Sequence, residues 1–247
     1  MTDVDAMRRV SVVIPCLNER DAIGAVVVDV LAQGVAEVVV VDNGSTDDTA
    51  ARATAAGATV VTQREHGYGR ACASGLAAVS SASTVVCFLD GDGSDVPSFM
   101  AAVIGPVVRD EADFVMGSRL RGRRESGSMT PQQIVAGRIA GRLIRLVYGV
   151  RYTDMSPFRA ATVEKLRALQ MRETTYGWNL EMQMKAAAAG WRVVEVPVDH
   201  RCRRGGVSKV SGDLVAGVKA AWIITKTFVR LAVSLKSASK LTEAVRS

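Results

Sequence analysis

The hydrophobic residues of this chain fall into short continuous runs, separated by longer stretches of helical character. The apolar runs predict strands at 10–15, 38–41, 58–61, 85–89, 113–117 and 191–198. The stretches between them predict helices that run to about residue 33, follow residues 45 and 70, and cover 96–108, 130–149 and 178–189. Strands made of continuous apolar residues are buried on both faces, and their alternation with helices indicates βαβ units. The pattern therefore predicts an α/β fold with a parallel sheet flanked by helices.

The predicted helix at 130–149 has well-marked ends and one basic face. Thr130 and Gln133 form a capping box at its start, and Gly149 is a typical residue after a helix end. Three arginines follow i, i+4, i+7 spacing on one face: Arg138, Arg142 and Arg145. We interpret this stripe as a solvated face, unless a phosphate-bearing partner lies against it.

The last predicted helix, at about 213–235, is mostly apolar. Lys219, Lys226 and Arg230 fall within a narrow arc of its helical wheel. Two interpretations stay open. The helix is amphipathic and lies in a membrane interface with its cationic face outward, or it packs against its own domain or a second copy in a dimer. No apolar stretch reaches the length of about 18 residues that a spanning helix needs.

The length of 247 residues fits one large domain or a domain with an appendage. The four cysteines show no CxxC pairing, and no N-terminal signal is visible, so we expect a cytoplasmic protein that is soluble or peripheral on the inner face of the membrane.

Residues 1–114 carry a net charge of −9 and residues 115–247 carry +15, which sum to the +6 of the chain. An acidic half joined to a basic half suits a polyanionic ligand between them. Nucleic acid is disfavoured, because no basic strand carries the aromatic residues that stack on bases.

The predicted strand at 85–89 ends in two carboxylates separated by one glycine, Asp90-Gly91-Asp92. In open α/β sheets, ligands bind at the carboxyl ends of the strands. Two carboxylates at i and i+2 on such a turn can share one hard cation, Mg²⁺ or Mn²⁺, through oxygen. The plainer interpretation is an ordinary Asp-Gly turn between a strand and a helix.

Other segments at the same edge also suit a charged ligand. Polar residues follow the first two strands at 15–19 and 42–46, and two basic, glycine-rich loops lie at 118–129 and 201–212. The first of these loops is long enough to be a mobile lid. When a sugar leaves a nucleotide diphosphate, negative charge develops on the diphosphate. A cation held by the carboxylates and basic residues on a closing loop would neutralise that charge.

Several motifs resemble those of the inverting family-2 glycosyltransferases, which have the GT-A fold. They are VVIPCLNE at 12–19, VVVVDNGSTDDT at 38–49, the Asp-Gly-Asp after an apolar strand, and GSR at 117–119. Later motifs resemble the dolichyl and polyprenyl-phosphate sugar synthase branch: DMSPFRA at 154–160 and EVPVDHRCRRGGVSKVSG at 195–212. The resemblance covers nearly the whole chain. It implies a Rossmann-like, mostly parallel sheet in residues 1–212, divided into a nucleotide-binding part at about 8–117 and an acceptor-side part at about 118–212. A C-terminal amphipathic helix and tail would occupy 213–247.

The resemblance also implies roles for particular residues. It places the metal on Asp90 and Asp92, and catalytic roles on Asp92, Arg119 and Asp154. Contacts to the nucleotide sugar would come from Pro15, Leu17, Asn18, Glu19, Asp42, Asn43, Gly67, Asp90, Gly91 and Asp92. Contacts to the acceptor or its phosphate would come from Arg119, Arg138, Arg203, Ser208 and Lys209.

These features predict a metal-dependent enzyme that moves a hexose from a UDP- or GDP-sugar to a polyprenyl phosphate. Two departures from the branch concern the acceptor: Pro157 stands where a glycine is usual, and the transmembrane helices of many members are missing after the domain. The alternatives are transfer to a soluble hydroxyl acceptor and a nucleotide-sugar-binding module without turnover. A hydroxyl acceptor needs a general base, which Asp154 would supply, whereas a lipid phosphate needs only an orienting group. Glu181 is a second candidate base, although a surface carboxylate is its simpler interpretation.

Overall fold

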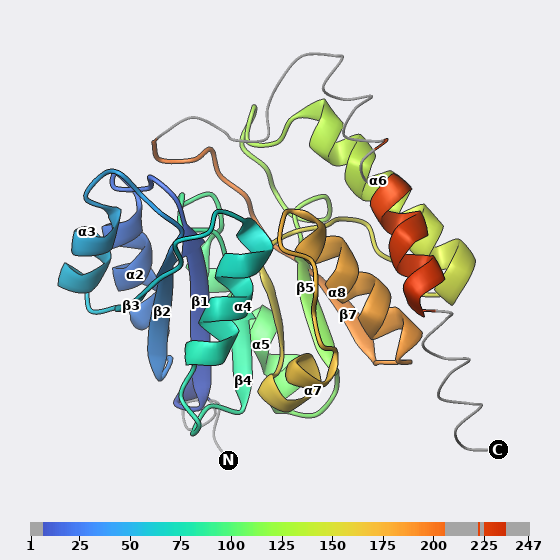
Figure 1. The fold of residues 1–247 in the computed structure, drawn as a ribbon, viewed down its shortest axis with the longest axis horizontal. Helices are drawn as coiled ribbons and strands as arrows, with labels where there is room; N and C mark the ends of the chain where they lie inside the picture. Colours follow the sequence, from blue (N-terminus) through green and yellow to red (C-terminus); the bar gives the residue numbers. More distant parts are fainter. Residues whose placement is uncertain (1–6, 206–221, 223–224, 236–247) are drawn as a thin grey trace.

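The computed structural model describes residues 7–205, 222 and 225–235 (Figure 1). Within this part, the strands form one sheet in the order β3-β2-β1-β4-β6-β5-β7. The strands are β1 (Val10–Cys16), β2 (Glu37–Asp42), β3 (Thr59–Thr62), β4 (Val85–Phe88), β5 (Phe114–Ser118), β6 (Arg159–Thr162) and β7 (Val193–Pro197). Every pairing is parallel except the two that β6 makes with β4 and β5. The mostly parallel α/β sheet is therefore confirmed.

Helices cover both faces of this sheet (Figure 1). They are α2 (Ile23–Leu31), α3 (Thr49–Ala55), α4 (Tyr68–Ala78), the short 3-10 helix η1 (Pro97–Phe99), α5 (Met100–Val108), α6 (Pro131–Tyr148), α7 (Val163–Ala168) and α8 (Gly177–Ala188). Residues Trp222 and 225–235 are also helical, and they are the described part of the helix predicted at 213–235. No helix among the described residues is long and apolar enough to cross a membrane.

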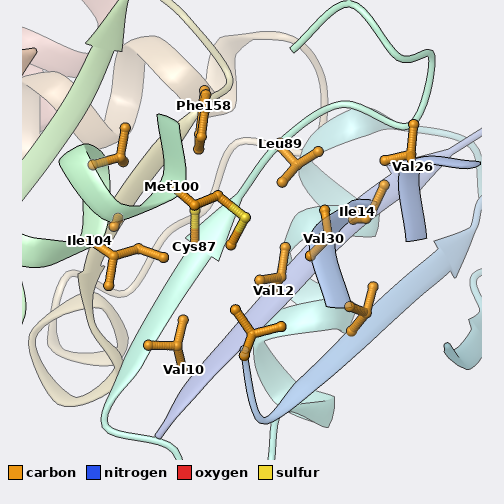
Figure 2. Close-up of a cluster of buried hydrophobic side chains, with 14 of the residues drawn as sticks. Val10, Val12, Ile14, Val26, Val30, Cys87, Leu89, Met100, Ile104 and Phe158 are labelled. Atoms are coloured by element: carbon orange, nitrogen blue, oxygen red, sulfur yellow. The ribbon is translucent and has the colours of Figure 1, made fainter. Parts of the chain in front are cut away.

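Two hydrophobic cores result from the alternation of side chains along the central strands. Val12 and Ile14 of β1 pack with α2 and α5 on one face, where they lie beside Val30 and Met100 (Figure 2). Val13, the residue between them, belongs to the opposite core together with α4, α6 and α8. Because both faces are covered, the sheet needs the continuous apolar runs from which its strands were predicted.

One strand is missing from the sequence prediction, because its residues carry almost no apolar signal. The sequence predicts no strand between residues 117 and 191, but Arg159–Thr162 forms β6, and a short helix follows from Val163. β6 is antiparallel and buried between β4 and β5, and its two central residues are alanines. The capping box of α6 forms as predicted, and Gly149 ends that helix in the left-handed conformation. The division of the chain at about residues 117 and 212 stays a prediction.

Helix α4 approaches the sheet so closely that one of its positions requires glycine. A Cβ atom on Gly75 would lie 2.3 Å from a methyl group of Val13 and 3.0 Å from one of Val41. Gly24 in α2 has only an oxygen at 3.9 Å. Substituting Gly75→Ala should lower the free energy of unfolding by about 1–3 kcal/mol despite the better helix propensity of alanine. The matched change Gly24→Ala should raise it by up to about 1 kcal/mol. Urea unfolding of the three proteins measures both effects, and equal stability of the two variants would contradict the packing described here.

Candidate functional site

A cavity of about 800 Å³ opens at the carboxyl ends of β1 and β4. It is lined by most of the residues for which the sequence predicts a ligand contact: Pro15, Leu17, Glu19, Asn43, Gly67, Asp90, Gly91, Asp92, Arg119 and Arg203. Segments far apart in the chain therefore meet at one edge of the sheet, as expected for the ligand crevice of an open α/β fold. Four predicted residues lie outside the lining: Asn18, Asp42, Arg138 and Asp154. Ser208 and Lys209 lie outside the described residues.

Asn18 joins the loops that follow β1 and β2, and Asp42 fixes the turn after β2. The side-chain oxygen of Asn18 accepts a hydrogen bond of 2.8 Å from the backbone N–H of Thr46. Asp42 accepts one of 3.0 Å from the backbone N–H of Ser45. Asn43 reaches further and accepts a bond of 2.7 Å from the N–H of Gly67. These polar residues at the strand ends therefore fix the backbone at the cavity edge.

Asp90 and Asp92 project from the turn after β4, and a third carboxylate lies behind them. The backbone N–H of Asp90 donates to Asp95, which is 2 % exposed, at 3.0 Å. Burial and the negative charges of Asp92 and Asp95 raise the pKa of Asp90 well above its usual range. The glycine between the pair is required, because a Cβ on Gly91 would lie 2.3 Å from the sulfur of Cys16. Negative charges this close together in a partly buried turn favour the binding of a cation.

The two carboxylates fit Mg²⁺ or Mn²⁺, which prefer hard oxygen ligands. Within the described residues, no cluster of three or more His, Cys, Asp or Glu side chains could hold a metal ion. Asp90 and Asp92 would thus be the only carboxylate ligands from this part of the chain. Mg²⁺ commonly binds through one or two carboxylates and takes its other ligands from water and substrate phosphates.

Arg119 enters the cavity as the partner of Asp154. Two hydrogen bonds of 2.8 Å join the guanidinium to the two carboxylate oxygens, and the Arg119 backbone N–H adds a third of 3.0 Å. Asp154 is only 1 % exposed. Burial acts to raise its pKa, but Arg119 and the hydrogen bonds outweigh burial and lower it. A carboxylate held in this way is a weak proton acceptor, so the geometry favours an orienting role for Asp154 over that of a general base.

Arg203 brings the second basic loop to the carboxylates. Its guanidinium lies 2.9 Å from both carboxylate oxygens of Glu19 and 3.8 Å from Asp92. The backbone N–H of the next residue, Arg204, donates to the carbonyl of Asp92 at 2.9 Å. Arg119 and Arg203, which both come from the basic half of the chain, therefore lie in the same cavity as the carboxylates of the acidic half. Arg138, by contrast, is exposed on α6.

Sequence reasoning missed an aromatic pair in the cavity. The rings of Tyr68 and Tyr176 stack with centroids 5.8 Å apart, and both residues line the cavity beside Asn179. Burial raises the pKa of Tyr68 well above its usual range, so its hydroxyl stays neutral. The position of Tyr68 in the glycine-flanked segment at 66–69 offered a signal. Tyr176 follows a featureless stretch and offered none.

The interpretation of Glu181 as a surface carboxylate is wrong. Glu181 is 1 % exposed, and its oxygens accept hydrogen bonds from the backbone N–H groups of Arg172 and Glu173. Lys185, one turn further along α8, lies 2.9 Å away. The carboxylate oxygens of Glu181 therefore fix the loop before α8. Glu181 is not among the residues that line the cavity.

Comparison with known proteins identifies relatives over most of the chain. The model of the family "Glycosyl transferase family 2" matches residues 11–167. An uncharacterised glycosyltransferase of Mycobacterium tuberculosis is 38% identical over 216 residues, which cover 85% of this chain and 94% of the relative. A dolichyl-phosphate hexose transferase of Haloferax volcanii is 33% identical over 199 residues, covering 79% of this chain and 84% of the relative.

The fold also matches solved structures. The glucosyl-3-phosphoglycerate synthase of Mycobacterium tuberculosis, crystallised with Mn²⁺, UDP and phosphoglyceric acid, superposes with a TM-score of 0.70. The match covers 92% of this chain and 80% of that structure at 24% sequence identity. At this identity the likeness establishes a shared fold.

The Arg119–Asp154 pair makes stability depend on pH. Removing one partner of a buried pair typically costs about 3–5 kcal/mol, so Asp154→Asn should lower the free energy of unfolding by about that amount at neutral pH. Because folding lowers the pKa of Asp154 from 3.8, the stabilisation is complete above the unfolded-state pKa and is lost as pH falls through the folded-state pKa. The difference between wild type and variant, measured by urea unfolding from pH 7 to pH 3, should therefore shrink in acid.

A matched control for this experiment is Asp110→Asn. Asp110 also pairs with an arginine, Arg192, but its side chain is 87% exposed. Exposed pairs contribute about 0–1 kcal/mol, so this variant should lie close to wild type throughout. A loss for Asp154→Asn as small as that of the control would show that the buried pair does not stabilise the fold.

Proposed function

The chain belongs to glycosyl transferase family 2, and on this premise we propose that it is a metal-dependent inverting glycosyltransferase that moves a hexose from a nucleotide diphosphate sugar to a polyprenyl phosphate. One observation carries the proposal. The half-buried carboxylates of Asp90 and Asp92 share a single cavity with Arg119 and Arg203 at the carboxyl edge of the sheet. This arrangement combines a place for a divalent cation with fixed positive charges for phosphate.

The donor would lie with its nucleotide towards the loops after β1 and β2 and its diphosphate at the carboxylates. Asp90 and Asp92 would hold Mg²⁺ or Mn²⁺, which when bound neutralises the charge that develops on the departing diphosphate. Arg119 is fixed in advance by Asp154, and Arg203 by Glu19. Charges that are already oriented cost no reorganisation as the transition state forms. The solved structure with the same fold holds Mn²⁺ and UDP, which supports this assignment.

A polyprenyl phosphate suits the other side of the cavity. Its lining there includes apolar side chains from α6, the loop before β6, and α8: Ala136, Met155, Pro157 and Leu180. A phosphate acceptor is already anionic near neutral pH and needs no general base. This agrees with an Asp154 that is engaged by Arg119. A relative named for dolichyl phosphate supports the same class of acceptor. We place the enzyme at the inner face of a membrane, where such a lipid would be found.

Transfer to a soluble hydroxyl acceptor is the competing proposal. The solved structure that binds phosphoglyceric acid supports it. This reaction needs a general base within reach of the hydroxyl. Both carboxylates considered for that role, Asp154 and Glu181, are buried, bound to other groups and outside the cavity lining. The described residues therefore favour the phosphate acceptor.

The metal assignment predicts a large effect of Asp92→Ala. Loss of a ligand should abolish the strengthening of UDP or GDP binding by Mn²⁺ and lower turnover by about 100-fold or more, since several kcal/mol of transition-state stabilisation are removed. Calorimetric titration of the nucleotide with and without Mn²⁺, together with release of nucleotide from its sugar, measures both. Glu111→Ala removes an exposed carboxylate elsewhere and should change neither. Full metal-dependent turnover in Asp92→Ala would refute the assignment.

The acceptor assignment predicts where a labelled sugar is transferred. With a panel of labelled nucleotide sugars, we expect label to enter the organic phase only when a polyprenyl phosphate is present. The unphosphorylated polyprenol should not be labelled, because it lacks an anionic nucleophile. Label that appears instead on 3-phosphoglycerate or another soluble hydroxyl compound would support the competing proposal.

A further inference from the structure

The outer sides of α6 and of the last described helix, residues 225–235 with Trp222, both carry exposed apolar and basic side chains. The two helices lie side by side (Figure 1), and their inner residues Ala140, Ile144, Phe228 and Leu231 belong to the same hydrophobic core. We define the two-helix face by the exposed residues on the opposite sides of these helices: Val135, Arg138, Arg142, Arg145 and Leu146 of α6, and Trp222, Lys226, Val229 and Val233 of the last helix.

The last helix has a second apolar side that faces solvent. Trp222, Val229 and Val233 follow i, i+7, i+11 spacing and are 61%, 54% and 61% exposed. Lys226 occupies position i+4 of the same stripe, and its ammonium group lies 4.9 Å from the centre of the Trp222 ring. A helix on the surface of a domain normally shows a polar outer side. A row of large apolar residues there indicates a surface that is covered by a partner.

Helix α6 adds positive charge next to this stripe. Arg138, Arg142 and Arg145 point outward, flanked by Val135 at 50% exposure and Leu146 at 83%. Neither 131–148 nor 225–235 contains an aspartate or a glutamate. Of the cations on the outer side of the last helix, Arg230 is bound to Glu173, whereas Lys226 lies over an aromatic ring. The two-helix face therefore combines exposed apolar groups with cations that its own helices do not neutralise.

We propose that the two-helix face docks on an anionic membrane surface. Tryptophan and aliphatic side chains between cations are typical of helices that lie in the headgroup region of a bilayer. Each lysine or arginine near an anionic leaflet contributes to binding. A second copy fits the face less well, because a two-fold contact brings the same patch of each subunit together. The arginines and Lys226 of both copies would then lie close to one another without carboxylates from these helices.

The same two helices border the cavity. Gln132, Gln133 and Ala136 of α6 and Thr227 of the last helix are among its lining residues. The helices that carry the two-helix face therefore also form part of the wall on the proposed acceptor side of the cavity. This inference rests on the proposed function only in naming a lipid as the acceptor, and membrane binding can be measured without any turnover.

The test is flotation of the full chain with vesicles of phosphatidylcholine alone or mixed with about one third phosphatidylglycerol. Wild type should float with the anionic vesicles, stay in solution with the neutral ones, and be released by about 0.5 M NaCl. Arg142→Gln with Arg145→Gln should weaken partition by about 30-fold, since each basic residue contributes about 1 kcal/mol. Trp222→Ser with Val229→Ser should weaken it on mixed vesicles without changing the salt response.

Matched controls keep the result specific. Arg52→Gln with Arg64→Gln removes the same charge from exposed sites elsewhere, and Val28→Ser changes a valine that is also 54% exposed. Both controls should float like wild type, and circular dichroism should confirm that all variants fold. A chain that ignores anionic vesicles, or charge controls that lose binding equally, would overturn the proposal. A dimer that dissociates in Trp222→Ser with Val229→Ser would show that a second copy covers the face. If the chain does not bind vesicles but still binds UDP or GDP, the membrane proposal is wrong and the proposed function stands.

Discussion

The site depends on the repulsion among carboxylates that lie close together in one half-buried turn. Asp90, Asp92 and Asp95 lie within six residues of each other after β4, and the pKa of Asp90 is raised because burial and its neighbours oppose its charge. Such a cluster is stable only when cations or protons balance it. Arginines from the basic half of the chain provide part of the compensating positive charge. The divalent cation that Asp90 and Asp92 suit would provide the rest.

The two arginines that face the cluster reach it in different ways. Arg119 follows directly on β5, so the sheet itself fixes its backbone, and the buried Asp154 fixes its guanidinium. Arg203 comes from a loop beyond β7 and is paired with Glu19 of the loop after β1. Each arginine is therefore oriented by a carboxylate that does not belong to the crowded turn. A charged ligand that enters the cavity meets groups already in position, which is the condition for electrostatic catalysis.

The sequence was most informative where burial of a segment in the fold also determines its pattern of apolar and polar residues. Continuous apolar runs identified the strands buried on both faces, and the polar residues at their ends identified the cavity, since parallel strands bring those ends to one edge. It was least informative where long-range contacts decide. β6 is held in place by its neighbours and not by its own alanines. Glu181 is buried where it accepts hydrogen bonds from two backbone N–H groups of the loop before α8, and no pattern in the sequence marks that contact. Tyr176 belongs to the cavity only through the packing of α8, which no local pattern records.

In the proposed reaction, the donor would bind at the edge of the sheet and the acceptor would bind beside helices α6 and α8. The central claim is that Asp90 and Asp92 hold the divalent cation on which the donor end depends. The most direct measurement is a crystal structure of the chain grown with Mn²⁺ and UDP, using anomalous diffraction at the manganese edge. The account predicts one strong anomalous peak within bonding distance of carboxylate oxygens of Asp90 and Asp92 and of the nucleotide diphosphate. A structure that contains UDP in the cavity but has its manganese bound elsewhere, or not at all, would contradict it.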